Sequence, residues 1–146
     1  MEEPYTPDSP ATLPRHLVVN WEGGRRYRAG PEGVPPILLD GDREAGPGSV
    51  DAVAAGLAAC SAIDVVDILE KRRTPVQALQ VDVRYARAEG VPRRIERVHL
   101  IYRVRTASAV HHVERAVQLS REKYCSVSAS LAPDILITTA VEVEEP

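Results

Sequence analysis

The sequence predicts an α+β fold with a mostly antiparallel sheet and two main helices. Three observations support this fold class: several runs alternate apolar with polar residues, a long run at 52–66 is almost wholly apolar, and an amphipathic run lies at 109–124. The strand-like runs come mainly as neighbours instead of alternating singly with helices. Most strand neighbours should therefore be antiparallel, with both helices on one face of the sheet.

The length of 146 residues suits one domain with a modest core. Residues 1–14 should form an extended arm, because prolines deny a segment regular hydrogen bonding. The prolines of this arm are Pro4, Pro7, Pro10 and Pro14. Residues 15–146 are expected to form the single domain.

The first strands should be short. Segments 16–22 and 25–30 are typical of two strands joined by a turn at the Gly23-Gly24 pair. Segment 35–42 predicts a third short strand, and a loop rich in glycine and proline follows it.

The first helix should extend over about 50–71. Ser49 is a suitable N-cap, and Asp51 lies in the first turn, where the helix dipole favours a negative charge. Its apolar part contains only Ser61 and Asp64 as polar residues. A helix that is apolar all round is normally buried on most sides. A monomer of this size would struggle to bury it, so a dimer with the first helices at its interface is the simplest solution.

The second half of the chain predicts a hairpin, a helix and a strand. Segments 76–88 and 94–106 alternate apolar and polar residues and flank a turn, which is typical of an antiparallel hairpin. Ser108 should cap the second helix at 109–124. Segment 134–145 predicts the closing strand.

Composition excludes several classes of protein. The net charge is −3 and the 18 Lys and Arg residues are scattered, so a nucleic-acid surface is not expected. The N-terminus lacks the apolar core of a signal peptide, and the longest apolar stretch should fall short of a membrane span. We therefore expect a cytoplasmic protein. Two cysteines are too few for a disulfide scaffold, and in a reducing compartment such a pair is more often redox-active or unpaired.

The two cysteines are the main candidates for chemistry. Cys60 lies in the middle of the apolar helix, where desolvation and Asp64 one turn later should raise its pKa, so it needs a cation from elsewhere to react. Taken alone, Cys60 is more readily explained as packing. If a helix restarts near Ser126, Cys125 lies at its N-terminus with Lys123 close by, and both features lower a thiol pKa.

Other candidate sites are weaker. His111 and His112 should be solvated, and no third ligand at suitable spacing predicts zinc. His99 lies on a strand face with several arginines, which is typical of a solvated face. There is no glycine-rich phosphate loop and no G-x-S-x-G motif, so no cofactor or metal is expected.

Two motifs carry a resemblance to a known family. "GPGSVDAVAAGLAACSAIDVVDIL" resembles the central-helix motif of the family that joins osmotically inducible protein C (OsmC) with organic hydroperoxide resistance protein (Ohr). "AVQLSREKYCSVSASL" resembles the second-cysteine helix of that family, and the OsmC-like subgroup is the most similar. The resemblance covers nearly the whole chain after the arm. It implies an OsmC-like fold and an intertwined homodimer with two active sites at its interface.

The resemblance also implies a thiol peroxidase that acts in oxidative-stress defence. Cys60 matches the peroxidatic cysteine and Cys125 the resolving one. The Cys60 thiolate would attack the O–O bond of an organic hydroperoxide and become a sulfenic acid, Cys125 would condense with it to a disulfide, and an external dithiol would restore both thiols. The buried surroundings of Cys60 would then admit an alkyl chain.

The family pairs its reactive thiolate with an arginine held by a carboxylate. Asp51 occupies the position of that carboxylate, where the family usually has Glu. Asp51 and Cys60 are nine residues apart, which places them on opposite sides of a straight helix and roughly 13 Å apart along its axis. Asp51 should therefore serve the partner's Cys60. Arg25 is the preferred arginine, with Arg26 and Arg43 as alternatives.

Two other hypotheses remain open. The same apolar pocket could bind a small lipophilic ligand in a dimeric protein without turnover. Alternatively, both cysteines could serve only packing, which predicts slow and unselective thiol labelling.

Overall fold

The computed structural model describes residues 13–146, which form two compact units. The first unit ends at Ser49 and the second comprises Val50–Pro146. The extended arm expected at 1–14 lies almost entirely outside the described residues. The single domain expected from residue 15 stays a prediction, and each unit is described by itself below.

The N-terminal unit contains a three-stranded antiparallel sheet in the order β1-β2-β3. Its strands are β1 (Val18–Trp21), β2 (Arg26–Gly30) and β3 (Ile37–Asp40). The expected turn lies between β1 and β2, where Gly23 and Gly24 have φ values of 98° and 57°. Residues other than glycine rarely adopt this left-handed backbone conformation, so the glycine pair permits the tight turn.

The sheet of the N-terminal unit has little core of its own. Among its described residues only Asp40 is buried. Several large apolar side chains are exposed, namely Leu17, Val18, Val19, Trp21, Tyr27, Val34 and Ile37. An uncovered apolar surface of this kind is typical of a surface that meets another molecule.

The second unit contains the larger sheet, in the order β4-β5-β6. Its strands are β4 (Val76–Arg87), β5 (Ile95–Thr106) and β6 (Leu136–Glu144). The β4–β5 pair forms the expected antiparallel hairpin, whereas β6 pairs parallel to β5, with Tyr102 opposite Val141. This pair departs from the antiparallel majority. The helical segment between β5 and β6 carries the chain back to the end of the sheet where β5 begins, so β6 runs parallel to β5.

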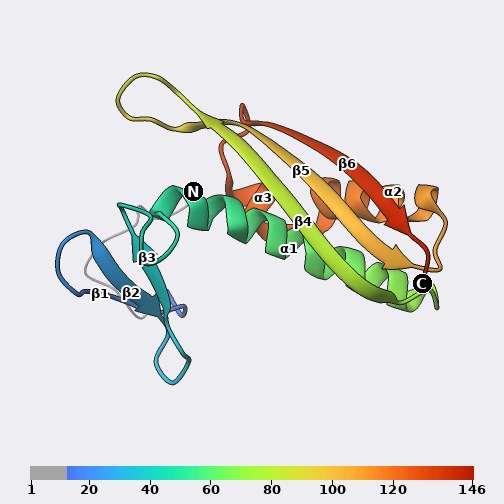
Figure 1. The fold of residues 1–146 in the computed structure, drawn as a ribbon, viewed down its shortest axis with the longest axis horizontal. Coiled ribbons are helices and arrows are strands. Elements are labelled where there is room, and N and C mark those ends of the chain that lie inside the picture. The colour runs from blue at the N-terminus through green and yellow to red at the C-terminus, as the bar shows by residue number, and fades with distance from the viewer. Residues whose placement is uncertain (1–12) are drawn as a thin grey trace, which may run out of the picture. The chain divides into compact units, whose positions relative to one another are not determined.

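Two main helices lie on one face of this sheet, as the sequence predicts (Figure 1). They are α1 (Ser49–Lys71) and α2 (Val110–Leu119), and a π-helical turn η2 (Ser120–Tyr124) and a short helix α3 (Ser126–Ser130) follow α2. Their apolar sides and alternate residues of β5 form one core. Its fully buried side chains include Leu57, Val65, Leu69, Val98, Leu100, Tyr102, Val104, Val113 and Val117.

The expected helix starts need correction. Ser108 does not cap α2: the N-cap residue is Ala109, which makes no side-chain capping bond, and the Ser108 hydroxyl is buried without a partner among residues 13–146. The reason is local, since the Ser108 amide donates to the Thr106 hydroxyl at 3.2 Å and the chain reaches the helix one residue later. Helix α1 begins at Ser49 itself.

Helix α1 has a buried face and an uncovered apolar face. Leu57 and Leu69 pack into the core, whereas Val53 is 42% and Ile63 61% exposed. The helix has 23 residues, and an 18-residue stretch within it has a mean hydropathy of 1.9, so by length and composition it could cross a membrane, contrary to the expected shortfall. The core helix of a soluble protein meets the same criteria, so this finding is weak evidence for a membrane span.

Candidate active site

The structure brings the two cysteines together. Cys60 lies on α1 and Cys125 lies at the start of α3, 65 positions later, and their side chains are close enough for Cys60 to affect the pKa of the Cys125 thiol. Both are free thiols; Cys60 is half-buried, whereas Cys125 is 4% exposed. The site therefore offers one accessible sulfur backed by one buried sulfur.

The π-helical turn η2 places Cys125. Its amide donates to the Ser120 carbonyl at 2.7 Å, which closes a five-residue turn. The backbone of Cys125 is then extended, with φ −72° and ψ 105°, and its Sγ accepts a hydrogen bond from the Ser128 amide at 3.4 Å. A helix therefore does restart at Ser126, with Cys125 as its N-cap.

The expected low pKa of Cys125 is wrong. Burial raises the pKa of the Cys125 thiol above its ordinary 9.0, and the neighbouring Cys60 raises it further, although the Ser128 and Val127 amides oppose the shift. Desolvation exceeds the effect of the short helix because the sulfur faces the core. The Lys123 side chain is exposed, and its Nζ lies over the Tyr124 ring, 5.4 Å from the ring centre.

A buried chain of hydroxyl groups lies beside the cysteines. The Ser61 hydroxyl is 2.7 Å from the Tyr102 hydroxyl, and the Ser120 hydroxyl is 3.1 Å from Ser61 and 2.7 Å from an Asp64 carboxylate oxygen. Tyr102, Ser61 and Ser120 are at most 1% exposed. Burial raises the pKa of Tyr102, so its hydroxyl remains protonated at neutral pH.

Sequence reasoning missed this chain of hydroxyl groups. One signal was available, because Tyr102 lies on the apolar face of its strand, and a buried tyrosine hydroxyl normally finds a hydrogen-bond partner. The identity of the partner was not available, since Ser61 is 41 residues away. Asp64, expected mainly to disfavour a Cys60 thiolate, accepts a hydrogen bond from Ser120.

Asp51 lies in the first turn of α1 and accepts a hydrogen bond from the Tyr85 hydroxyl of β4. This contact anchors the start of the helix to the sheet of the same unit. Its role beside a partner's cysteine stays a prediction.

The candidate arginines belong to the N-terminal unit. Arg25 pairs with Asp42 at 3.4 Å, and Arg26 pairs with the buried Asp40 at 3.4 Å. Arg43 lies in the loop after β3 with a φ of 57°. Which arginine serves the reactive thiol stays a prediction.

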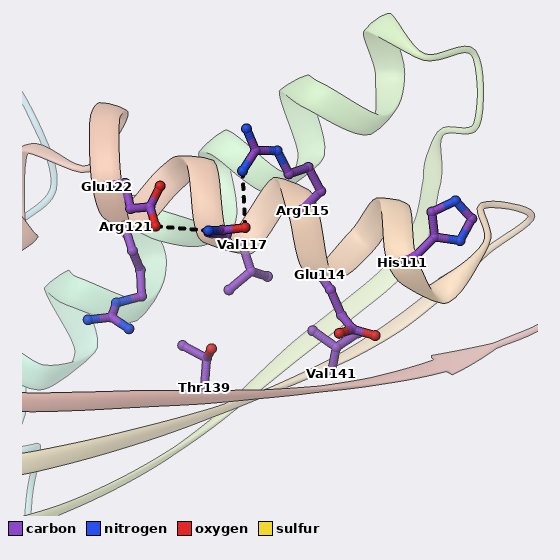
Figure 2. A pocket seen from close by; sticks show the side chains of 9 residues that line it. His111, Glu114, Arg115, Val117, Arg121, Glu122, Thr139 and Val141 are labelled. Atoms are coloured by element: carbon purple, nitrogen blue, oxygen red, sulfur yellow. Dashed lines mark hydrogen bonds between the residues drawn. The ribbon is translucent and has the colours of Figure 1, made fainter.

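A groove of about 730 Å³ lies between α2 and β6, and Figure 2 shows its side chains. Gln118 bridges Arg115 and Glu122 along the helix. The Arg121 side chain points toward the sheet, and its Nε is buried without a partner among the described residues. Groups of both charges line the groove, and neither cysteine does, so it does not resemble a pocket for an alkyl chain.

The two neighbouring histidines differ in their surroundings: His111 is exposed as expected, whereas His112 is half-buried and not fully solvated. His111 and His112 pack with ring centres 3.9 Å apart, and burial and Arg72 lower the pKa of His112. His99 hydrogen-bonds Thr138 at 2.7 Å. No group of three or more potential ligands for a metal occurs within residues 13–146.

Comparison with known proteins identifies the family. Residues 40–140 match the family model described as OsmC-like protein. The chain belongs to the OsmC-like family. Protein YhfA of Escherichia coli K12 is 35% identical over 127 residues, which cover 86% of this chain and 95% of YhfA.

Solved structures share this OsmC-like fold. A hypothetical protein from Aquifex aeolicus is 24% identical, with a TM-score of 0.81 over 90% of this chain and 96% of its own. The organic hydroperoxide resistance protein OhrB of Bacillus subtilis is 16% identical, with a TM-score of 0.59 over 88% of this chain and 96% of its own. At these identities the likeness establishes the fold.

Proposed function

We propose that this OsmC-like protein is a cysteine-based peroxidase that reduces organic hydroperoxides in oxidative-stress defence. The observation that carries the proposal is the proximity of the Cys60 and Cys125 side chains, which lets Cys60 raise the pKa of Cys125. OhrB, whose name assigns it to organic hydroperoxide resistance, shares the fold. The name of YhfA states no activity, so the reaction rests on the thiol pair.

The reaction balances with the two thiols and one external dithiol. The Cys60 thiol first releases its proton, and the thiolate attacks the hydroperoxide; the O–O bond breaks, Cys60 becomes a sulfenic acid, and the leaving alkoxide takes up one proton to become an alcohol. The Cys125 sulfur then attacks the Cys60 sulfur; an S–S bond forms, and the hydroxyl leaves as water with the Cys125 proton. The dithiol reduces the disulfide and is itself oxidised.

The unequal surroundings of the two sulfurs fit these roles. Cys60 is half-buried and therefore reachable by a substrate, whereas Cys125 is buried and its pKa is raised. A thiol that stays protonated does not compete for peroxide, and it carries the proton that the leaving hydroxyl needs. Cys125 thus suits the resolving role and Cys60 the peroxidatic role.

We propose that the active protein is a homodimer. The exposed apolar residues of α1 in one unit, and those of the β1–β3 sheet in the other, each supply an apolar surface that a second copy would cover. In such a dimer Asp51 and Arg25 would serve the partner's Cys60, with Arg26 or Arg43 as the alternative cation. We place the reaction in the cytoplasm, where reductants keep both thiols reduced.

The activity of single variants tests the proposal. Wild type, Cys60→Ser and Cys125→Ser are assayed with cumene hydroperoxide and a dithiol such as dihydrolipoamide. Cys60→Ser should abolish turnover, whereas Cys125→Ser should still form one sulfenic acid per chain and then stall unless the external thiol attacks directly. Equal activity in Cys60→Ser and wild type would overturn the proposal.

A second candidate function is the binding of a small lipophilic ligand without turnover. The exposed apolar side chains of the β1–β3 sheet favour it, because they could equally line a ligand site. Native mass spectrometry of the purified protein distinguishes the two functions: a retained ligand with a peroxide-inert Cys60 supports binding alone.

A further inference from the structure

The buried hydroxyl groups form a chain with one direction. A hydroxyl has one proton, so Ser120 can donate to only one of its two neighbours, and the shorter contact is to the Asp64 carboxylate at 2.7 Å. Ser61 must then donate to Ser120, and Tyr102 to Ser61. Each hydroxyl in this arrangement donates once, and the chain ends on an acceptor, so its members support one another.

Ser120 makes hydrogen bonds through both its side chain and its backbone. Its side chain bonds to Ser61 and Asp64, both on α1, within one turn of Cys60. Its backbone carbonyl accepts the amide of Cys125 at 2.7 Å. One fully buried residue therefore connects the helix that carries the first thiol to the backbone of the second thiol.

The π-helical turn between Ser120 and Cys125 also favours a positioning role for Ser120. An ordinary α-helical turn would join Ser120 to residue 124, whereas the π-helical turn reaches Cys125. π-helical turns are rare and occur frequently at functional sites. A disulfide requires Cα atoms about 4.4–6.8 Å apart with suitably directed Cβ atoms, so the placement of Cys125 by one residue matters.

We infer that Ser120 is a positioning residue that holds Cys125 against Cys60 for disulfide formation, and that it does so through its hydrogen bond to Asp64. The inference deepens the proposed peroxidase, since the disulfide is its second step. It assigns Ser120 no contact with the peroxide.

The test measures how readily the disulfide closes, without using peroxide. Each variant is equilibrated in glutathione buffers of known redox ratio, and the Cys60–Cys125 disulfide is quantified by mass spectrometry after alkylation. The equilibrium constant against glutathione reports how well the two thiols are placed relative to each other. Ser120→Ala should lower this constant by about tenfold, the effect of one lost hydrogen bond to a charged group.

A second pair of variants tests the same hydrogen bond from α1. Asp64→Ala and Asp64→Asn remove the same charge beside Cys60, but only the amide of Asn still accepts from Ser120. Asp64→Ala should therefore match Ser120→Ala, while Asp64→Asn stays within about twofold of wild type. This pair decides the matter if Ser120→Ala does not fold, because position 64 is half-buried on a helix that tolerates alanine.

Ser130→Ala is the matched control, since it removes a serine hydroxyl that, among residues 13–146, donates to the Ser126 carbonyl within α3 at 2.7 Å. It should leave the equilibrium constant unchanged. Ser120→Ala or Asp64→Ala within about twofold of wild type, or equal losses in Asp64→Ala and Asp64→Asn, would overturn the inference. The proposed peroxidase function is tested by a different result: if it is wrong, peroxide leaves Cys60 unoxidised, whatever the equilibrium constant against glutathione.

Discussion

The side chains of Cys60 and Cys125 interact although 65 positions separate them in the chain. This proximity places a half-buried thiol on α1 near a buried thiol at the start of α3. It makes the two sulfurs chemically different, and this difference leads to the first prediction.

Cys125 should react slowly with alkylating reagents at neutral pH. In the Cys60→Ser variant, the rate of Cys125 labelling by iodoacetamide should keep rising beyond pH 9, because burial raises its pKa above 9.0. The folded state holds this proton more tightly than the unfolded state. The contribution of this thiol to the stability of the folded state is therefore fully present below pH 9.0 and is lost as the pH rises through the folded pKa. A labelling midpoint below pH 8 would contradict the assignment.

The buried hydroxyl chain predicts an order of stabilities. Ser61→Ala leaves the Tyr102 hydroxyl buried without its acceptor and should cost about 1–3 kcal/mol in the free energy of unfolding. Tyr102→Phe removes the first donor but leaves Ser61 able to donate to Ser120, so it should cost about 1 kcal/mol. Urea unfolding of both variants gives the comparison, and a larger loss in Tyr102→Phe would mean that the chain runs in the opposite direction.

Asp40 should organise the loop after β3. Its buried carboxylate accepts the amides of Asp42 at 2.9 Å, Glu44 at 3.3 Å and Ala45 at 2.9 Å. Asp40→Ala should remove the protection of these amides from hydrogen exchange while the β4–β5 hairpin keeps its protection. The comparison of the two regions within one sample serves as the control.

The same carboxylate gives the loop a dependence on acid. The Ala45 and Asp42 amides hold the pKa of Asp40 below its ordinary 3.8, although burial opposes them. A lowered pKa stabilises the folded state above the ordinary value and loses this contribution as the pH falls through the folded pKa. Exchange protection of the loop should therefore persist at pH 4 and be lost only in stronger acid.

The apolar outer face of α1 predicts self-association. Ile63 is 61% exposed, so Ile63→Glu should be tolerated by an isolated chain but should dissociate a dimer that buries this face. Val91→Glu is the control, since Val91 is 98% exposed in the β4–β5 turn. Analytical ultracentrifugation should show a dimer for wild type and for the control and a monomer for Ile63→Glu. A wild-type monomer would refute the proposed dimer.

Local sequence patterns predict the elements of this fold well. The alternation in 94–106 predicts β5, the long apolar run predicts α1 within one residue, and the serine-rich segment after Cys125 predicts the helix restart. These features depend on neighbouring residues. The parallel partner of β5 was not predictable in this way, since alternation indicates a strand without stating which strand lies beside it.

The properties of the site depend on distant contacts. The pKa of Cys125 follows from burial in a core that the whole second unit builds, so its local position at a helix start predicts the wrong direction. Ser120 is similar, because its partners lie 56 and 59 residues away on α1. Residue type and spacing identified the two thiols, but the groups that position them became visible only in three dimensions.

The most direct test of the central claim is mass spectrometry of the reduced protein after one equivalent of cumene hydroperoxide. We predict that Cys60 and Cys125 become joined in a disulfide, that Cys125→Ser instead shows a sulfenic acid at Cys60, and that a dithiol reverses both products. If the peroxide leaves both cysteines reduced, or oxidises Cys125 and leaves Cys60 unchanged, the account is contradicted.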